Sequence, residues 1–229
     1  MTKRRRLAVA LVAGLVLWFG APLLLRQVGF FRVRQIELVG VRYLAPAAVI
    51  GALRLPPGAS VFDDLDEITA RVRALPGVAD ARVVRRVPGS LKVMLREVEP
   101  VAFVPGRDTR ELSVVDGEGR PLPYDPARRA LDLPVAASAD SGLVAMLALV
   151  QAVDPTLFEE ITTARSRRSD MVLELGPRRL LLARDAGPEV IRAVVLVTQD
   201  LASRSRRYAE LDARYAGQIV VRRAVGGGA

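Results

Sequence analysis

The chain of 229 residues contains neither cysteine nor histidine. These two absences exclude disulfide bonds, a thiol nucleophile, a Ser-His-Asp triad and the zinc sites that are built from Cys and His ligands. Lysine is almost absent as well, since Lys3 and Lys92 are the only two and every other basic residue is arginine. We attribute this bias to a GC-rich genome rather than to a phosphate-binding role.

Charge is missing from one long segment near the N-terminus. Residues 7–25 (LAVALVAGLVLWFGAPLLL) carry no charged side chain, and Lys3, Arg4, Arg5 and Arg6 precede them. About 20 apolar residues in a helix cross the hydrocarbon core of a bilayer, and a short basic flank favours a cytoplasmic N-terminus. The sequence therefore predicts a cytoplasmic tail at 1–6, a transmembrane helix at 7–25 and an extracytoplasmic main body.

The alternative for this segment is a cleaved signal peptide. Cleavage needs small residues before the cut, but Phe19 precedes Ala21, and Pro22 directly after Ala21 opposes cleavage. Three arginines just beyond the segment weaken the charge asymmetry that sets the orientation. In both cases the main body lies outside the cytoplasm.

The chain is basic, with a net charge of +9. In a cytosolic protein this surplus would suggest nucleic acid as a partner. For an exported body, anionic lipid headgroups, wall polymers or acidic proteins are the better candidates, and we expect no nucleic acid.

Residues 26–99 predict a small α+β domain with the order strand, helix, helix, strand, strand. We expect a strand at 33–39, helices at about 46–53 and 60–75, and strands at 78–87 and 90–98 that meet at Pro88 and Gly89. Ser60 or Asp63 is the expected cap of the second helix. The expected apolar positions of the two helices are Val49, Ile50, Leu53, Leu65, Ile68, Val72 and Leu75.

Residues 100–225 predict a mainly antiparallel β domain with two helices, and 226–229 a flexible Gly-rich tail. The helices are expected at 141–153 and 188–203, and a hairpin turn at 116–119. The expected strands cover 101–104, 111–115, 157–165, 171–175, 179–184, 210–215 and 218–223.

No segment carries a specific catalytic signal, and we expect no catalytic residue, cofactor or metal. The densest acidic cluster is Asp63, Asp64, Asp66 and Glu67. We interpret it as the first turn of a helix, where carboxylates stabilise the helix dipole, rather than as an acid/base or metal site. Ser90 and Lys92 are unconvincing as a dyad because nothing indicates a desolvated lysine. Arg165, Arg167 and Arg168 are more typical of a solvated strand end than of an anion site.

Several local strings are distinctive together because of their order and spacing. They are residues 31–40 (FRVRQIELVG), 75–83 (LPGVADARV), 88–93 (PGSLKV), 97–102 (EVEPVA), 115–119 (VDGEG) and 212–215 (DARY). These strings and the order of parts resemble the FtsQ/DivIB family of bacterial cell-division proteins, and the first domain resembles the family's POTRA domain. The family usually has Arg where Val98 stands, and Leu where Ala213 stands.

The resemblance implies a non-enzymatic scaffold of the division machinery, anchored in the cytoplasmic (inner) membrane at the septum. Such a scaffold binds FtsB- and FtsL-like single-span proteins and helps control septal peptidoglycan synthesis. It also implies that Arg214 pairs with a partner carboxylate and that Tyr215 packs against apolar residues of the partner. The predicted partner-binding residues are Arg214, Tyr215, Gln218, Ile219, Val220, Val221 and Arg222.

Two other functions fit parts of the pattern. A POTRA module for protein export would usually precede an outer-membrane barrel, and no run of long alternating strands follows here. A membrane-anchored cell-wall hydrolase would need a carboxylate pair or a Ser-Lys dyad, since histidine and cysteine are missing.

The predicted anchor is testable by replacing Gly14 with Arg. A charge at the centre of a membrane helix costs about 2.5–3.5 kcal/mol on insertion scales, so Gly14→Arg should impair insertion. Protease added outside spheroplasts should digest the main body of the unaltered protein. Protection of that body in intact spheroplasts would contradict the predicted orientation.

Overall fold

The computed structural model describes residues 29–106, 111–126 and 131–223, and the chain divides into two compact units between Val98 and Glu99. The predicted tail and transmembrane helix, as well as the Gly-rich tail, lie outside these described residues. Within the described part of the chain, no helix combines the length and the apolar character needed to cross a membrane.

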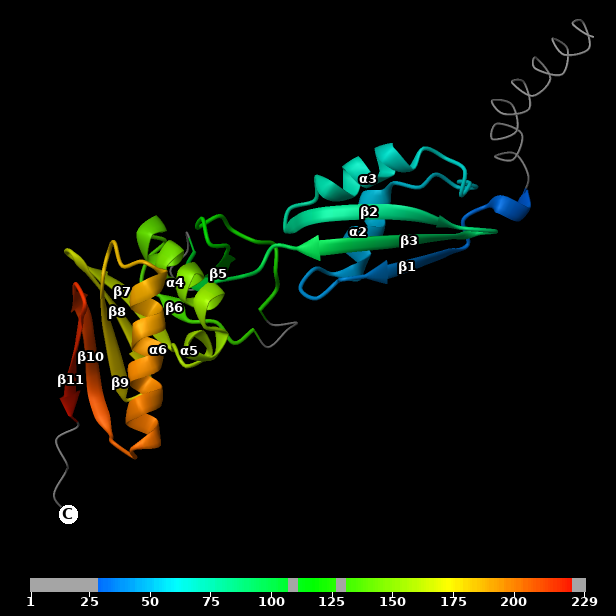
Figure 1. Ribbon diagram of the computed structural model, residues 1–229. Helices are drawn as coiled ribbons and strands as arrows, with labels where there is room; N and C mark the ends of the chain where they lie inside the picture. The colour runs from blue at the N-terminus through cyan, green and yellow to red at the C-terminus, as the bar shows by residue number, and fades with distance from the viewer. Residues whose placement is uncertain (1–28, 107–110, 127–130, 224–229) are drawn as a thin grey trace, which may run out of the picture. The chain divides into compact units, whose positions relative to one another are not determined.

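The first unit has the predicted order of one strand, two helices and two strands. After a 3-10 turn, η1 (Gly29–Phe31), the elements are β1 (Gln35–Val39), α2 (Pro46–Leu53), α3 (Leu65–Arg73), β2 (Val78–Arg86) and β3 (Ser90–Glu97). The strands form one sheet in the order β1-β3-β2, with β1 parallel and β2 antiparallel to β3. Figure 1 shows α2 and α3 beside this sheet.

The core of the first unit follows from alternation along β3. Leu91, Val93 and Leu95 are buried on one face, whereas Arg96, which follows Leu95 and lies on the other face, is exposed. The helices contribute their expected apolar positions with two exceptions. Leu75 lies beyond the end of α3 at Arg73 and is only half-buried. Ile50 is 46% exposed, because only Val49 and Leu53 of α2 reach the core.

The N-cap of the second helix lies one residue after Asp63 and four residues after Ser60, the two predicted caps. Asp64 is the N-cap of α3, and its carboxylate accepts hydrogen bonds from the backbone N–H groups of Asp66 and Glu67. The Asp63 carboxylate instead accepts from the N–H of Ser60 in the preceding turn. The acidic cluster therefore serves the start of a helix, as the sequence indicated.

A buried glutamate joins the end of β3 to the chain that leaves β1. Glu97 is 5% exposed, and its carboxylate accepts hydrogen bonds from the backbone N–H groups of residues 42, 43 and 44. Gly40 precedes this loop with φ +88°, and a Cβ there would lie 2.0 Å from the carbonyl oxygen of Leu95. The close approach of the two backbones thus requires glycine at this position.

The second unit is built on one eight-stranded sheet in the order β11-β10-β9-β8-β7-β6-β4-β5. Its strands are β4 (Ala102–Pro105), β5 (Leu112–Val115), β6 (Val135–Ala136), β7 (Thr163–Arg167), β8 (Asp170–Leu175), β9 (Arg178–Ala183), β10 (Tyr208–Tyr215) and β11 (Gln218–Arg223). Four neighbour pairs are antiparallel and three are parallel, so the sheet is mixed, with antiparallel pairs in the majority. The parallel pairs arise where a connection crosses over instead of turning back directly.

The described residues of this unit contain three helices, one more than predicted. α4 (Ser141–Val153) and α6 (Pro188–Ser203) have the predicted bounds. The third, α5 (Pro155–Glu159), occupies part of the segment predicted as a strand at 157–165. The Asp154 carboxylate caps it by accepting the N–H of Leu157 at 2.7 Å, and Pro155 suits the first helical position.

The helices cover one face of the eight-stranded sheet and the other face is charged. α4 and α6 contact each other and pack on the strands (Figure 1). The fully buried side chains at this interface include Leu143, Leu147, Leu173, Leu180, Leu182, Ile191 and Leu211. Residues that alternate with them along the strands, such as Glu174, Arg179 and Glu210, point to the opposite face.

Gly40→Ala tests the close backbone contact between Gly40, which follows β1, and Leu95 of the neighbouring strand β3. Left-handed backbone costs a residue with a Cβ about 1–2 kcal/mol, and the clash with Leu95 adds to this. Gly58→Ala is the matched control, since Gly58 has φ +85° but meets only the flexible end of Arg32. Urea unfolding should show a clearly larger loss for Gly40→Ala, whereas equal losses would contradict the contact.

Candidate functional site

The predicted partner-binding residues gather at one edge of the second sheet. Among the described strands, β11 is the outermost and pairs only with β10, and Figure 1 shows it in red beside that strand. Arg214 and Tyr215 end β10, and a turn at Gly217 leads into β11. An edge strand carries a row of backbone N–H and C=O groups without a sheet partner, which another strand can pair with.

The side chains of β11 alternate between the two faces of the sheet. Ile219 and Val221 pack against the hydrophobic core beneath the helices. Val220 is 41% exposed on the opposite face, where Arg222 lies 3.3 Å from Glu210 of β10. A strand added outside β11 would continue both faces and would place its own apolar residues toward the helices.

Arg214 is held by two carboxylates of its own chain. Its Nε and one terminal nitrogen donate to the two oxygens of Asp212 at 2.8 and 2.7 Å. The other terminal nitrogen donates to Asp170 of β8 at 2.5 Å. Asp212 is 1% exposed, so the guanidinium neutralises a carboxylate that would otherwise be buried without a counter-charge.

The register of the sheet explains how Arg214 reaches a strand two positions away. Ala213 pairs with Leu182 of β9, and the next residue, Ala183, pairs with Asp170 of β8. The small side chain of Ala183 leaves the space above β9 open. The guanidinium can therefore extend across β9 to the carboxylate on β8.

These contacts shift the protonation equilibria of all three groups. Hydrogen bonds from Arg214 lower the pKa of Asp212 below its usual value, although burial acts in the opposite direction. The same guanidinium lowers the pKa of Asp170. The pKa of Arg214 is raised by its hydrogen bonds to both carboxylates. All three groups stay charged at neutral pH.

The family resemblance implied a salt bridge between Arg214 and a partner carboxylate, and it did not predict the internal pairing. Within the chain, the guanidinium pairs with two carboxylates, one from β8 and one from β10. Asp212 lies two residues before Arg214 on the same strand, hence on the same face, which was a sequence signal for this pair. Nothing local pointed to Asp170, which is 44 residues away.

Beside the edge, a groove of about 320 Å³ lies between α6 and the β10–β11 turn. Tyr215 and Ile219 line it from the sheet, and Val190, Ala193 and Val197 line it from α6. Tyr215 is 56% exposed, and the Arg214 guanidinium lies 5.8 Å from the centre of its ring. The groove thus offers an apolar floor directly next to the free strand edge.

The other candidates take structural or surface positions. Lys92 pairs with Glu37 on β1 at 3.0 Å, and this surface salt bridge argues against a Ser90–Lys92 dyad. Arg165 pairs with Glu174. With Arg167 and Arg168 it borders a depression of about 330 Å³ on the charged face, which Arg214 and Arg222 also line. Among the described residues, no three or more acidic side chains are arranged to hold a metal ion.

Comparisons with known proteins agree in both units. Residues 31–97 match the POTRA domain of FtsQ type. The Cell division protein FtsQ of Rhodothermus marinus is 30% identical, over 96% of this chain and 88% of that protein. The Cell division protein FtsQ of Jannaschia sp. is 30% identical, over 84% of this chain and 63% of its own length. The Cell division protein FtsQ of Anaeromyxobacter sp. (strain K) is 34% identical over 58% of this chain, and the aligned part covers about half of that relative.

Asp212→Asn tests the charge pair in the second sheet. The pKa of Asp212 is lower in the folded state than in the unfolded state. The ionised carboxylate therefore contributes fully to the free energy of unfolding above about pH 4, and this contribution is lost as the pH falls through the pKa of the folded state. At pH 7 we expect a loss of about 1.5–3 kcal/mol in the free energy of unfolding.

Unfolding by urea between pH 7 and pH 2 provides the measurement. The free energies of unfolding of the parent and of Asp212→Asn should become equal as the pH falls toward 2. Asp200→Asn is the control, because Asp200 is an exposed carboxylate paired with Arg204 on the surface of α6. A constant gap between the parent and Asp212→Asn at every pH would contradict the charge pair.

Proposed function

Because this chain belongs to the FtsQ family of cell-division proteins, we propose that it is a non-enzymatic, single-span scaffold of the division machinery. The apolar residues 7–25 would anchor it in the cytoplasmic membrane with both folded units outside the cytoplasm. There it would bind FtsB- and FtsL-like partners at the septum and help to control septal peptidoglycan synthesis.

The proposed mode of binding is the addition of a partner strand to β11. The observation that supports it is the position of β11 at the end of the sheet, where no other described strand pairs with the outer side of its backbone. Main-chain hydrogen bonds in such an added strand supply affinity, and alternate side-chain pockets supply specificity. The edge of β11 offers the main-chain groups, and the apolar groove that Ile219 of β11 lines offers a side-chain pocket.

Tyr215 is the residue best placed to select the partner side chain. It stands half-exposed at the groove, where an apolar residue from the added strand would cover it and Ile219. The arginines on the charged face, including Arg167, Arg168 and Arg222, favour an acidic partner. Arg214 acts in this scheme by holding β10 in position, through its pairs with the buried Asp212 and with Asp170.

A pair of proline substitutions at adjacent positions of β11 tests strand addition. Neighbouring residues of a strand direct their N–H groups to opposite sides. One of Val220→Pro and Val221→Pro therefore breaks a hydrogen bond to β10, and the other removes a donor from the free edge. The first is identified by its lowered melting temperature, and the second by a melting temperature near that of the parent.

The informative variant is the one that keeps its melting temperature. Its affinity for the exported segment of the FtsB-like partner should fall at least about tenfold in a calorimetric titration, because a lost backbone hydrogen bond and the ring's bulk both oppose pairing. Leu112→Ser on β5, the opposite edge of the same sheet, is the control and should bind normally. Undiminished binding by the well-folded proline variant would place the partner elsewhere.

A further inference from the structure

Three segments meet at one end of the first unit, close to where the chain enters it. The backbone N–H groups of Arg34 and Gln35 donate to the carbonyl oxygen of Gly89 in the β2–β3 turn. The N–H of Val61, in the loop before α3, donates to the carbonyl oxygen of Phe31. Figure 1 shows η1, in blue, next to the tips of β2 and β3.

This end exposes apolar side chains that the fold does not cover. Phe30 is 59% exposed and Val87 is 61% exposed. Phe30 meets Phe31 edge to face at 5.2 Å between ring centres, and Phe31 meets Phe62 in the same way at 5.1 Å. The three rings thus form a continuous row from the half-buried Phe62 and Phe31 to the exposed Phe30.

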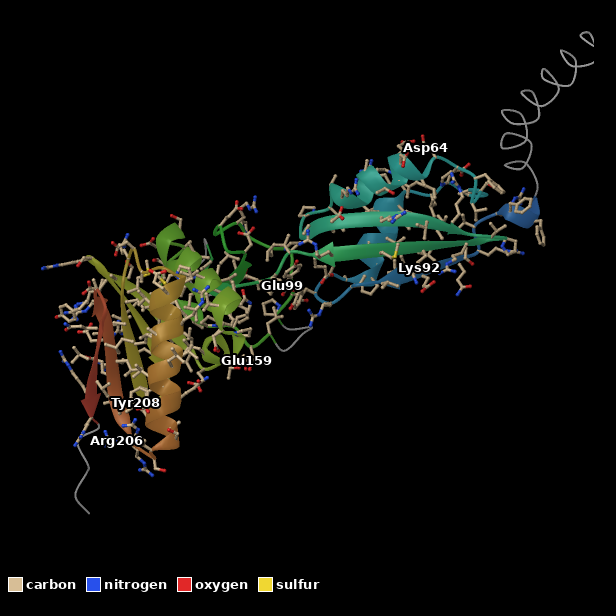
Figure 2. All side chains as sticks on the ribbon, viewed as in Figure 1. Asp64, Lys92, Glu99, Glu159, Arg206 and Tyr208 are labelled. Carbon is tan, nitrogen blue, oxygen red and sulfur yellow. The ribbon has the colours of Figure 1, made fainter. Side chains whose placement is uncertain are left out.

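Arginines surround these apolar side chains. The Arg34 guanidinium donates to the carbonyl oxygen of Phe30 and lies 6.0 Å from the centre of its ring, which fixes the ring on the surface. Arg32 and Arg86 are exposed, and neither makes a salt bridge within the described residues. The nearby acidic residue Asp64 belongs to the helix layer and caps α3, and Figure 2 shows it over that helix.

The length of chain before this end limits how far it can lie from the predicted membrane segment. Gly29 follows Leu25 by four residues. A fully extended chain covers at most about 3.3–3.6 Å per residue, so Gly29 stays within about 15 Å of the end of residues 7–25. The polar headgroup region of one leaflet is about 5–8 Å deep, so Gly29 lies in this region or within about 10 Å of its outer boundary.

We propose that Phe30, Val87, Arg32, Arg34 and Arg86 form a juxtamembrane patch that binds the headgroup region of the anionic bilayer in which the chain is anchored. Aromatic rings favour the membrane–water interface, where one side is apolar and the other wet. Guanidinium groups pair with phosphate through two parallel hydrogen bonds. The proposal rests on the proposed anchor, and it would hold the first unit against the membrane surface.

The absence of cysteine makes a site-directed label the direct test. A nitroxide is attached to Val87→Cys in the full chain, reconstituted into vesicles of phosphatidylcholine with phosphatidylglycerol. The matched control is Val39→Cys, which is also an exposed valine but lies at the other end of β1 in the same sheet. Collisions with a water-soluble nickel complex should be several-fold rarer at position 87 than at position 39.

Charge dependence separates a specific patch from simple proximity. Arg32→Gln with Arg86→Gln, in the Val87→Cys background, removes two exposed arginines and should leave the melting temperature unchanged. Since each basic group near an anionic surface contributes about a fivefold factor, the double replacement should lower binding of the patch about 25-fold. Collisions at position 87 should then rise to the value at position 39, as they should for the unaltered patch in pure phosphatidylcholine.

Equal collision rates at positions 87 and 39 in the anionic vesicles would overturn the patch. So would protection at position 87 that is the same with and without phosphatidylglycerol. If the labelled chain still resists extraction by alkaline carbonate, those results leave the proposed anchor intact. Release of the chain by carbonate would contradict the anchor itself, and the patch with it.

Discussion

The charge cluster of Asp212, Arg214 and Asp170 is the interaction on which the C-terminal edge depends. A carboxylate buried as deeply as Asp212 is strongly destabilising unless a counter-charge and hydrogen bonds accompany it. Arg214 supplies both and also reaches Asp170, so that β10 is tied to β8 across β9. Since β11 has no other sheet neighbour among the described strands, its position follows from that of β10.

The charge cluster thus holds β11 in position, although this strand has sheet hydrogen bonds to a described strand on one side only. Exposed edges invite unwanted pairing, and natural proteins often protect them with charges or keep them short. The opposite edge, β5, is four residues long, whereas β11 has six and carries Arg222 and Arg223 near its end. Those charges guard against non-specific strands, but they also favour an acidic partner strand, so protection and selectivity can come from the same side chains.

The sequence predicted those parts of the fold that local chemistry determines. The bounds of α4 and α6 follow from a capping Asp140 and from Pro188 at a first helical position. The order of strands and helices in the first unit was predictable for the same reason, because local signals mark where these elements begin and end. Local signals failed for α5, because its two apolar residues Leu157 and Phe158 suit a strand as well as a short buried helix.

Local sequence signals could not predict which strands pair when they lie far apart in the chain. Parallel contacts such as β9 with β10 join segments that are separated by the whole of α6. The edge position of β11 was a condition of the predicted partner site, and the structure meets that condition. The internal pair of Arg214 with Asp170 could not be predicted, because Asp170 comes within reach only through the register of three strands and the small Ala183 between them.

Hydrogen–deuterium exchange of the full chain, with and without the exported segment of the FtsB-like partner, tests the central claim most directly. Amides of an unpaired edge exchange readily, and pairing with a new strand protects them. The account predicts that protection rises in β11 and around Tyr215, while β5 at the opposite edge exchanges as before. Partner binding that protects another surface and leaves the exchange of β11 unchanged would contradict it.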